Sequence, residues 1–447
     1  MSVKDKSLFS LSWPLIVTFG IGMALPMLDS RFLSFRSVEA AAGVGALMPV
    51  IGTLFMAIHA FAQAGASIAS QFLGGSKPRH AQVTQTLVIA GSAAMGLAMG
   101  VMLWFSTPTI VSLMGLRGEQ AQAAVKFLHT ISPAIMFRAL QGTLTSLVAT
   151  HGRTIWNLFS NIIMLVINVV LNNIFLKGYF GVPEFMQGVY GVAIATNLSW
   201  IAATIILWIV VVYSLEHKTK AIDIKKGYFV LLPEWLRIGV PAAIEPVSFQ
   251  LFQVFVIYLF VKLGDVSMAS RVFAGNFAMC AVVLSVGLGS GSQILVAHLV
   301  GNKDFDKANK RMHQSLVWSC SGAFVVAIVV ALTGQQLFSY VFNIKDQDIL
   351  RLGGMLLWCD VVLQPFKASN IVITNALRAA GDSAFPAVFG TISMWTLGLG
   401  TTLFLCYGLE LGAVGLWLGM ASDEFYRSIA NYTRWRRGKW KSKGVIR

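Results

Sequence analysis

Long apolar stretches, separated by short polar breaks, cover almost the whole chain. An α-helix needs about 20 apolar residues to cross the hydrocarbon core of a bilayer, so each long stretch predicts one membrane span. The pattern predicts about twelve spans and therefore an all-α integral membrane protein. The predicted spans centre on residues 8–33, 41–70, 82–106, 122–148, 155–177, 188–214, 233–262, 270–299, 309–333, 347–377, 383–407 and 412–432.

The composition agrees with a membrane protein. The 447 residues are 56% hydrophobic and 12% charged, with a mean hydropathy of +0.71, whereas soluble domains carry about 25% charged residues. The net charge of +15 does not indicate a nucleic-acid partner, because the basic residues lie in short loops and at the C-terminus. We therefore expect contact with membrane lipid, no nucleic-acid binding, and action as a monomer.

The polar breaks alternate in charge. If the N-terminus lies in the cytoplasm, the inward-facing breaks carry most of the basic residues, including the linker EHKTKAIDIKKGY and the tail RWRRGKWKSKGVIR. Cytoplasmic loops of membrane proteins are enriched in Lys and Arg, so this alternation predicts that both termini are cytoplasmic. We expect a multi-pass protein of a bacterial cytoplasmic (inner) membrane.

The chain also repeats itself. Three pairs of positions recur within similar local sequences: Pro14 with Pro241, Gly74 with Gly301, and Gly152 with Gly381. The members of the first two pairs are 227 residues apart and those of the third are 229 apart. This register predicts two pseudo-symmetric six-helix lobes of parallel topology, which suit alternating access. The predicted parts are an N-lobe at 1–214, a basic cytoplasmic linker at 215–232, a C-lobe at 233–433 and a basic cytoplasmic tail at 434–447.

Polar side chains inside the predicted spans are the main functional signal, because a charge in hydrocarbon costs about 2.5 kcal/mol or more. Four oxygen-bearing side chains from three spans of the N-lobe share one depth in the outer half of the membrane: Asp29, Asn168, Asn172 and Thr196. One carboxylate with two amides and a hydroxyl suits a small hard cation such as Na⁺, and equally suits a protonation site. The alternative for Asp29 is an interfacial residue beside Arg31.

The C-lobe offers a second polar group. Glu245 and Lys367 lie at equal depth with opposite charge, which predicts an ion pair in a cavity, of either functional or purely structural importance. Asp360 and Gln364 are four residues apart on one helix face, and we expect them to line the same cavity further out. Arg138 in the fourth span is another cationic candidate, with snorkelling toward the inside as its alternative.

Enzyme chemistry has no support in the sequence. No HExxH, GxSxG or paired acidic motif is present, and the four cysteines lack the spacing of a metal or redox site. We therefore predict a protein that is not an enzyme and that needs no cofactor apart from a coupling ion, Na⁺ or H⁺.

The chain resembles the multidrug and toxic compound extrusion (MATE) transporters over essentially its whole length. The resemblance rests on Pro14 followed by Asp29, on NVVLNNIFLKGYFGVPE with GVAIAT after it, and on ALRAAGDSAFP. It implies a V-shaped fold of twelve helices and export of cationic, often aromatic, drugs in exchange for sodium or protons. Carried over by motif, the N-lobe cation site consists of Asp29, Asn168, Asn172 and Thr196.

The C-lobe departs from one branch of that family. The branch has a glutamate eight residues after the proline of the seventh helix and an aspartate in the tenth, where this chain has Phe249 and Lys367. Glu245 lies one turn earlier, so we expect coupling to depend on the N-lobe, with sodium favoured by its oxygen-rich site. The alternative function is a flippase for lipid-linked precursors, which has a related fold but favours extra helices and several cavity arginines.

Overall fold

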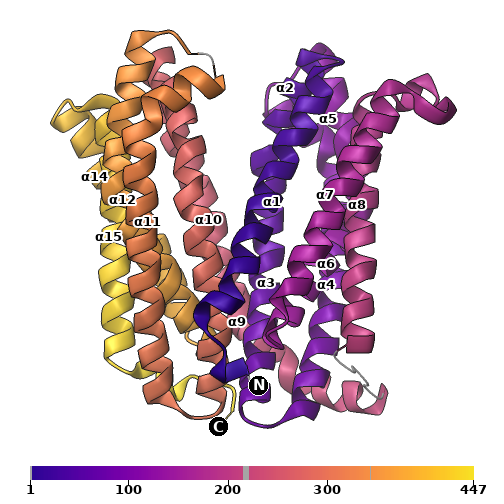
Figure 1. Ribbon diagram of the computed structural model, residues 1–447, viewed down its shortest axis with the longest axis vertical. Helices are drawn as coiled ribbons and strands as arrows, with labels where there is room; N and C mark the ends of the chain where they lie inside the picture. The colour runs from indigo at the N-terminus through magenta and orange to yellow at the C-terminus, as the bar shows by residue number, and fades with distance from the viewer. Residues whose placement is uncertain (1–2, 215–220, 343, 447) are drawn as a thin grey trace. The chain divides into compact units, whose positions relative to one another are not determined.

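The computed structural model describes residues 3–214, 221–342 and 344–446, and these residues are almost entirely helical (Figure 1). Residues 215–220 of the predicted basic linker lie outside the described residues, and a helix begins directly after them at Ala221. The first eight α-helices are α1 (Leu8–Ser34), α2 (Val38–Ala46), α3 (Met48–Gly74), α4 (Pro78–Leu113), α5 (Gly118–Ile131), α6 (Ile135–Thr150), α7 (Thr154–Lys177) and α8 (Val189–Ile209).

The later helices are longer on average. They are α9 (Ala221–Lys262), α10 (Asp265–Gly301), α11 (Phe305–Phe342), α12 (Gln347–Ala379), α13 (Ala384–Ser393), α14 (Leu399–Leu403) and α15 (Gly412–Arg436). Short 3-10 or π-helical turns complete the chain: η1 (Val3–Asp5), η2 (Ser132–Ala134), η3 (Tyr179–Gly181), η4 (Glu184–Met186), η5 (Val210–Ser214), η6 (Met394–Gly398), η7 (Phe404–Gly408) and η8 (Lys439–Ser442). The turns η6 and η7 join α13 and α14 into one continuous span, Ala384–Gly408.

Ten helical segments in the described residues are long and apolar enough to cross a membrane. Two further predicted spans fail that criterion for identifiable reasons. The span at 122–148 is divided into α5 and α6 at η2, where Pro133 has no backbone N–H to donate. The other, α15, has 25 residues but carries buried charges such as Asp423 and Arg427. With these two, the prediction of about twelve membrane helices in an all-α protein is confirmed.

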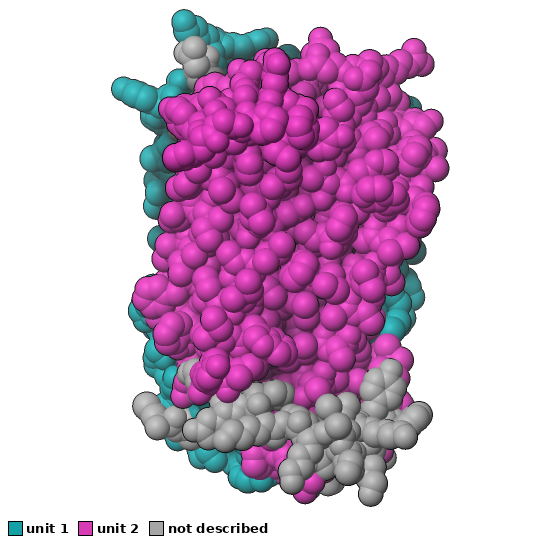
Figure 2. Space-filling view, turned by 90° about the vertical axis from the view of Figure 1, so that its right-hand side faces the viewer, with its two compact units in different colours: residues 1–16, 70–76, 240–447 teal, residues 17–69, 77–239 magenta. Residues whose placement is uncertain are grey.

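The chain forms two compact units, coloured separately in Figure 2. The first unit contains residues 1–16, 70–76 and 240–447, and the second contains residues 17–69 and 77–239. The first unit thus takes in the start of α1 and the end of α3 as well as the C-terminal helices. The lobe boundaries that the repeat suggests stay a prediction.

Each unit has its own apolar core, and its outer helices also present apolar side chains outward. In the second unit, Leu33, Leu47 and Leu128 are almost fully buried in one cluster. On α4, by contrast, Leu97, Val101 and Phe105 are exposed by 56%, 50% and 78%. These three residues are spaced by four and therefore share one helix face. A broad apolar face that is exposed in the isolated chain is what lipid covers in a membrane protein.

Candidate functional site: a buried carboxylate among neutral donors

Asp29 in α1 lies at the centre of a buried polar cluster in the second unit. The Nδ2 atoms of Asn168 and Asn172, both in α7, donate to its Oδ1 at 3.1 and 2.9 Å. The Oγ1 of Thr196, in α8, lies 2.9 Å from its Oδ2. All four side chains are at most 4% exposed. The four residues that the sequence singled out in the N-lobe are thus in direct contact.

The helices that carry these residues place them for local reasons. Asn168 and Asn172 are one turn apart in α7, and the Nδ2 of Asn172 also donates to the Oδ1 of Asn168 at 3.1 Å. At the start of α8, Gly191 approaches the end of α7 so closely that a Cβ would lie 2.7 Å from the Cβ of Phe175. This close approach holds α8 against α7 and brings Thr196 level with both asparagines.

The charge of Asp29 has only neutral partners. No described Lys, Arg or His side chain forms an ion pair with it, although both of its carboxylate oxygens accept hydrogen bonds. The Oδ1 of Asn172 is buried and has no hydrogen-bond partner. A buried acceptor without a donor is unfavourable, and here it lies beside an uncompensated carboxylate. An amide oxygen with no donor and a carboxylate with only neutral donors therefore belong to the same hydrogen-bonded cluster.

This arrangement can accept a small positive charge. The hydroxyl of Thr196 has a single proton and two acceptors within reach, Asp29 Oδ2 at 2.9 Å and Val192 O at 3.0 Å. An asparagine amide rotated by half a turn presents oxygen where it presented nitrogen. The same side chains can therefore donate to a bare carboxylate or turn their oxygens toward a cation. Carboxylate, amide and hydroxyl oxygens are the ligands that hard cations prefer.

The predicted ion pair between Glu245 and Lys367 is wrong. Glu245 Oε2 lies 2.7 Å from Arg378 Nη2, and its Oε1 lies 3.5 Å from Arg427 Nη1. The Nζ of Lys367 lies 5.7 Å from the ring centroid of Phe249 instead. The depth count assumed that the predicted ends of the two spans at 233 and 377 lie level with each other, whereas Glu245 contacts Arg378, one residue before α12 ends at Ala379. Glu245 is consequently level with the end of α12, where Arg378 lies, about three turns beyond Lys367.

Asp360 and Gln364 are in contact, as their spacing suggested. The Nε2 of Gln364 lies 3.0 and 3.2 Å from the two carboxylate oxygens of Asp360, and both residues are almost fully buried. Arg138 lies in the second unit, where its Nη1 donates to Gln141 Oε1 at 2.6 Å and its guanidinium lies 5.0 Å from the ring centroid of Phe55. A shared cavity for Asp360, Gln364 and Glu245 stays a prediction.

The main group that sequence reasoning missed is centred on Arg427. Its Nε lies 3.0 Å from Asp423 Oδ2 and its Nη2 lies 2.9 Å from Glu424 Oε1, in addition to the contact with Glu245. The network contains three carboxylates and, with Arg378, two guanidinium groups. The segment ASDEFYR already carried the signal, because acids three and four residues before an arginine lie on the same helix face.

Comparison with known proteins gives the family. The sequence model of the MatE family matches residues 14–174 and 241–403, which is well over half of the chain. The chain therefore belongs to the MatE family, whose members are membrane transporters and not enzymes, and which need no cofactor beyond a coupling ion. The two matches begin at Pro14 and Pro241, the same pair that marked the internal repeat.

Full-length relatives and solved structures agree with this assignment. The chain is 28% identical over 442 residues to the "Uncharacterized transporter YisQ" of Bacillus subtilis, covering 99% of this chain and 96% of that protein. It is 24% identical over 452 residues to the "Probable multidrug resistance protein NorM" of Thermotoga maritima, covering 99% and 94%. The crystal structure of the Vibrio cholerae MATE transporter VcmN, a mutant form, superposes with a TM-score of 0.86 at 17% identity, covering 97% of each chain.

Proposed function

We propose that the protein is a cation-coupled multidrug efflux antiporter that exports organic, mostly cationic and aromatic compounds by alternating access. In this proposal Asp29, Asn168, Asn172 and Thr196 bind the coupling ion, with Na⁺ favoured and H⁺ the second choice. Export of toxic compounds by this route would confer antibiotic resistance. The name of the Thermotoga relative, a probable multidrug resistance protein, supports the substrate class.

The observation that carries the proposal is the uncompensated carboxylate of Asp29. It is buried in a helix bundle, its partners are neutral, and the Oδ1 of Asn172 beside it has no donor. A carboxylate in such surroundings is stable with either a proton or a metal cation bound, and binding of one excludes the other. The oxygen-rich set of neighbours favours Na⁺ over a proton.

Coupling requires that the ion and the drug prefer different conformations. Each ligand shifts the equilibrium between two conformations only by its differential affinity for them. External Na⁺ that binds at Asp29 would favour the state that releases drug outward, and loss of the ion inside would complete the exchange. The charge of Asp29 is the only acidic one in this cluster, so it is the residue that can switch.

The proposed setting is a bacterial cytoplasmic membrane with both termini inside and one chain as the functional unit. The bacterial relatives support the location, and the basic loops support the orientation. A flippase for lipid-linked precursors is the less favoured function. The match to the MatE family supports an exporter, and the described residues contain about twelve spans, whereas flippases favour extra helices.

The test is gradient-driven dye transport by the purified protein in proteoliposomes, with sodium and pH gradients imposed separately. We expect an inwardly directed sodium gradient to drive export of a cationic aromatic dye. Asp29→Asn should abolish gradient-driven export while leaving the unfolding temperature close to that of the wild type. A suitable control is Asp265→Asn, which removes an exposed carboxylate in the first turn of α10.

Three outcomes would contradict parts of the proposal. Export driven by a pH gradient and indifferent to sodium would make the same residues a proton site. Wild-type export by Asp29→Asn would remove the coupling role of this cluster. No export of any cationic dye under either gradient would reject the substrate class.

A further inference from the structure

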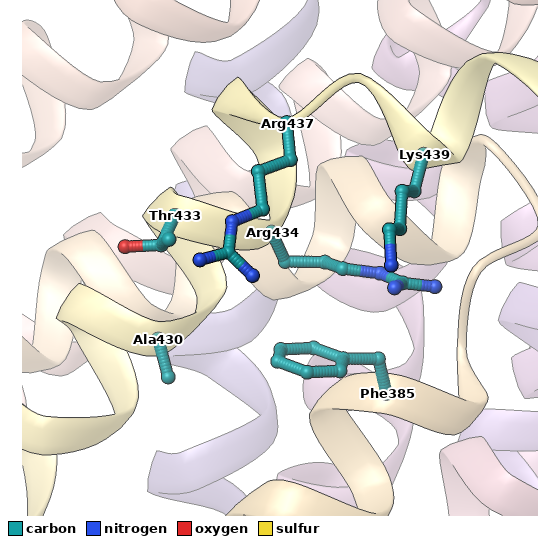
Figure 3. Close-up of a pocket in the computed structure, with 6 residues that line it drawn as sticks. All are labelled: Phe385, Ala430, Thr433, Arg434, Arg437 and Lys439. Carbon is teal, nitrogen blue, oxygen red and sulfur yellow. The ribbon is translucent and has the colours of Figure 1, made fainter.

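A cationic pocket lies at the end of α15, in the first unit (Figure 3). Its volume is about 290 Å³, and it is lined by Phe385, Ala430, Thr433, Arg434, Arg437 and Lys439. In the view of Figure 3 the ends of Arg434 and Lys439 meet above the ring of Phe385, and the guanidinium of Arg437 lies to the other side, toward Thr433. The proposed coupling-ion site of Asp29, Asn168, Asn172 and Thr196 uses none of these residues.

One of the three cations that line the pocket, Arg434, is paired with a carboxylate and held in place by it. The Nε and Nη2 of Arg434 donate to the two carboxylate oxygens of Asp382 at 2.7 and 3.1 Å, a bidentate ion pair. The guanidinium of Arg434 also lies 4.9 Å from the ring centroid of Phe385. Because Asp382 balances Arg434, the charges of Arg437 and Lys439 remain in excess. Among the described residues neither of these two has an ion-pair partner.

The backbone holds the two excess cations together. Gly438 adopts the left-handed conformation, with φ of 68°, and reverses the chain between Arg437 and Lys439. The following turn is anchored by Trp440, whose ring stacks on Trp435 with centroids 4.1 Å apart and whose Nε1 donates to Trp435 O at 2.9 Å. Both tryptophans are 1% exposed. The tail is therefore folded onto the helix end, and Lys439 does not depend on a free loop for its position.

The two excess cations, Arg437 and Lys439, line one cavity and repel each other unless an anion lies between them. Guanidinium and ammonium groups beside a hydroxyl, here that of Thr433, are the donors that bind phosphate oxygens. The membrane supplies such an anion at this depth. The 25 residues of α15 extend about 37 Å, which exceeds the hydrocarbon thickness of about 30 Å, so its last turn reaches the headgroup layer.

We propose that this pocket binds the phosphate of an anionic glycerophospholipid in the leaflet that faces the basic tail. Arg437, Lys439 and Thr433 contact the phosphate oxygens, and Ala430 with the ring of Phe385 contacts the apolar glycerol and acyl portion. The bound lipid ties the start of α13 to the end of α15, because Phe385 comes from one and Arg437 from the other. The shared chemistry is a phosphate ester anion, and the source is lipid rather than free phosphate.

The experiment compares two charge-matched double variants of the full chain in detergent micelles. Arg437→Gln with Lys439→Gln removes one Arg and one Lys from the pocket. Arg436→Gln with Lys441→Gln removes the same charges from the same tail but outside the pocket lining. Binding of phosphatidylglycerol, of phosphatidylcholine and of inorganic phosphate is measured by native mass spectrometry and by the shift of the unfolding temperature.

We expect the wild type and the Arg436/Lys441 variant to bind phosphatidylglycerol in preference to phosphatidylcholine, and the Arg437/Lys439 variant to bind it about tenfold more weakly. Equal losses in both variants would overturn the proposal, because they would indicate only the overall charge of the tail. Inorganic phosphate that binds as well as phosphatidylglycerol would overturn the lipid assignment. Dye transport is measured in parallel, and its failure in Asp29→Asn leaves this lipid test unaffected.

Discussion

Gly74 at the end of α3 lies against the backbone of His298 in α10, so that a Cβ at position 74 would be 2.0 Å from the carbonyl oxygen of His298. Gly301 at the end of α10 meets Gln71 in the same way, with a Cβ-to-oxygen distance of 1.9 Å. Gly74 and Gly301 are 227 residues apart, and so are Gln71 and His298. The contact is therefore reciprocal, because each glycine packs against the residue three positions before the other glycine.

Gly301→Ala is expected to destabilise the protein by about 1–3 kcal/mol, because the new methyl group overlaps a backbone oxygen that cannot rotate away. Unfolding of the purified protein by heat or denaturant in detergent would measure the loss. Gly275→Ala in the same helix is the control, since its Cβ would meet no atom within 4 Å. In an open helical position, alanine is favoured over glycine by about 1 kcal/mol. Equal stability of the two variants would contradict the close packing.

Replacing Glu245 by Gln is expected to cost about 3 kcal/mol, because it leaves Arg378 without its carboxylate partner in a largely buried position. A double-mutant cycle of Glu245→Gln with Arg378→Gln should give a coupling energy of about 1–3 kcal/mol. The matching cycle with Lys367→Gln should give a value near zero, because Lys367 contacts Phe249 instead. Strong coupling to Lys367 in the unfolding free energies would restore the pairing expected from the sequence.

The sequence predicted the cluster around Asp29 but not the partner of Glu245, and the two cases differ in how far residue spacing determines the contact. The Asp29 cluster was predictable because Asn168 and Asn172 are fixed on one face by their spacing, and few other polar side chains share that depth. Glu245 had several cationic candidates, and choosing among them needed the true ends of α9 and α12 and the rotation of α15. Helix rotation and end position depend on packing of apolar side chains, which a depth count does not contain.

Asn172→Ala is expected to weaken the sodium dependence of drug release more than it weakens drug binding measured without sodium. The substitution removes the buried Oδ1 that has no donor and one of the two amide donors to Asp29. The measurement is release of bound dye from purified protein as sodium is titrated. The control is Asn173→Ala, since the neighbouring amide donates to Val169 O on its own helix and not to Asp29. An identical sodium dependence in both variants would count against Asn172 as a ligand.

Thr196→Val is the most selective probe of the cluster, because valine keeps the shape of threonine and removes only the hydroxyl. In the absence of sodium, Asp29 Oδ2 loses its hydrogen bond of 2.9 Å, and the expected loss of stability is about 1–3 kcal/mol. Thr196→Ser retains the hydroxyl and should retain most of the stability.

A ligand that binds only the folded state stabilises it by RT ln(1 + [L]/Kd), so sodium should raise the unfolding temperature of the wild type in a concentration-dependent way. If Thr196 contributes an oxygen to the ion, this sodium-dependent rise should be smaller in Thr196→Val than in Thr196→Ser. A rise of equal size in the two variants would restrict Thr196 to a hydrogen-bond donor for Asp29.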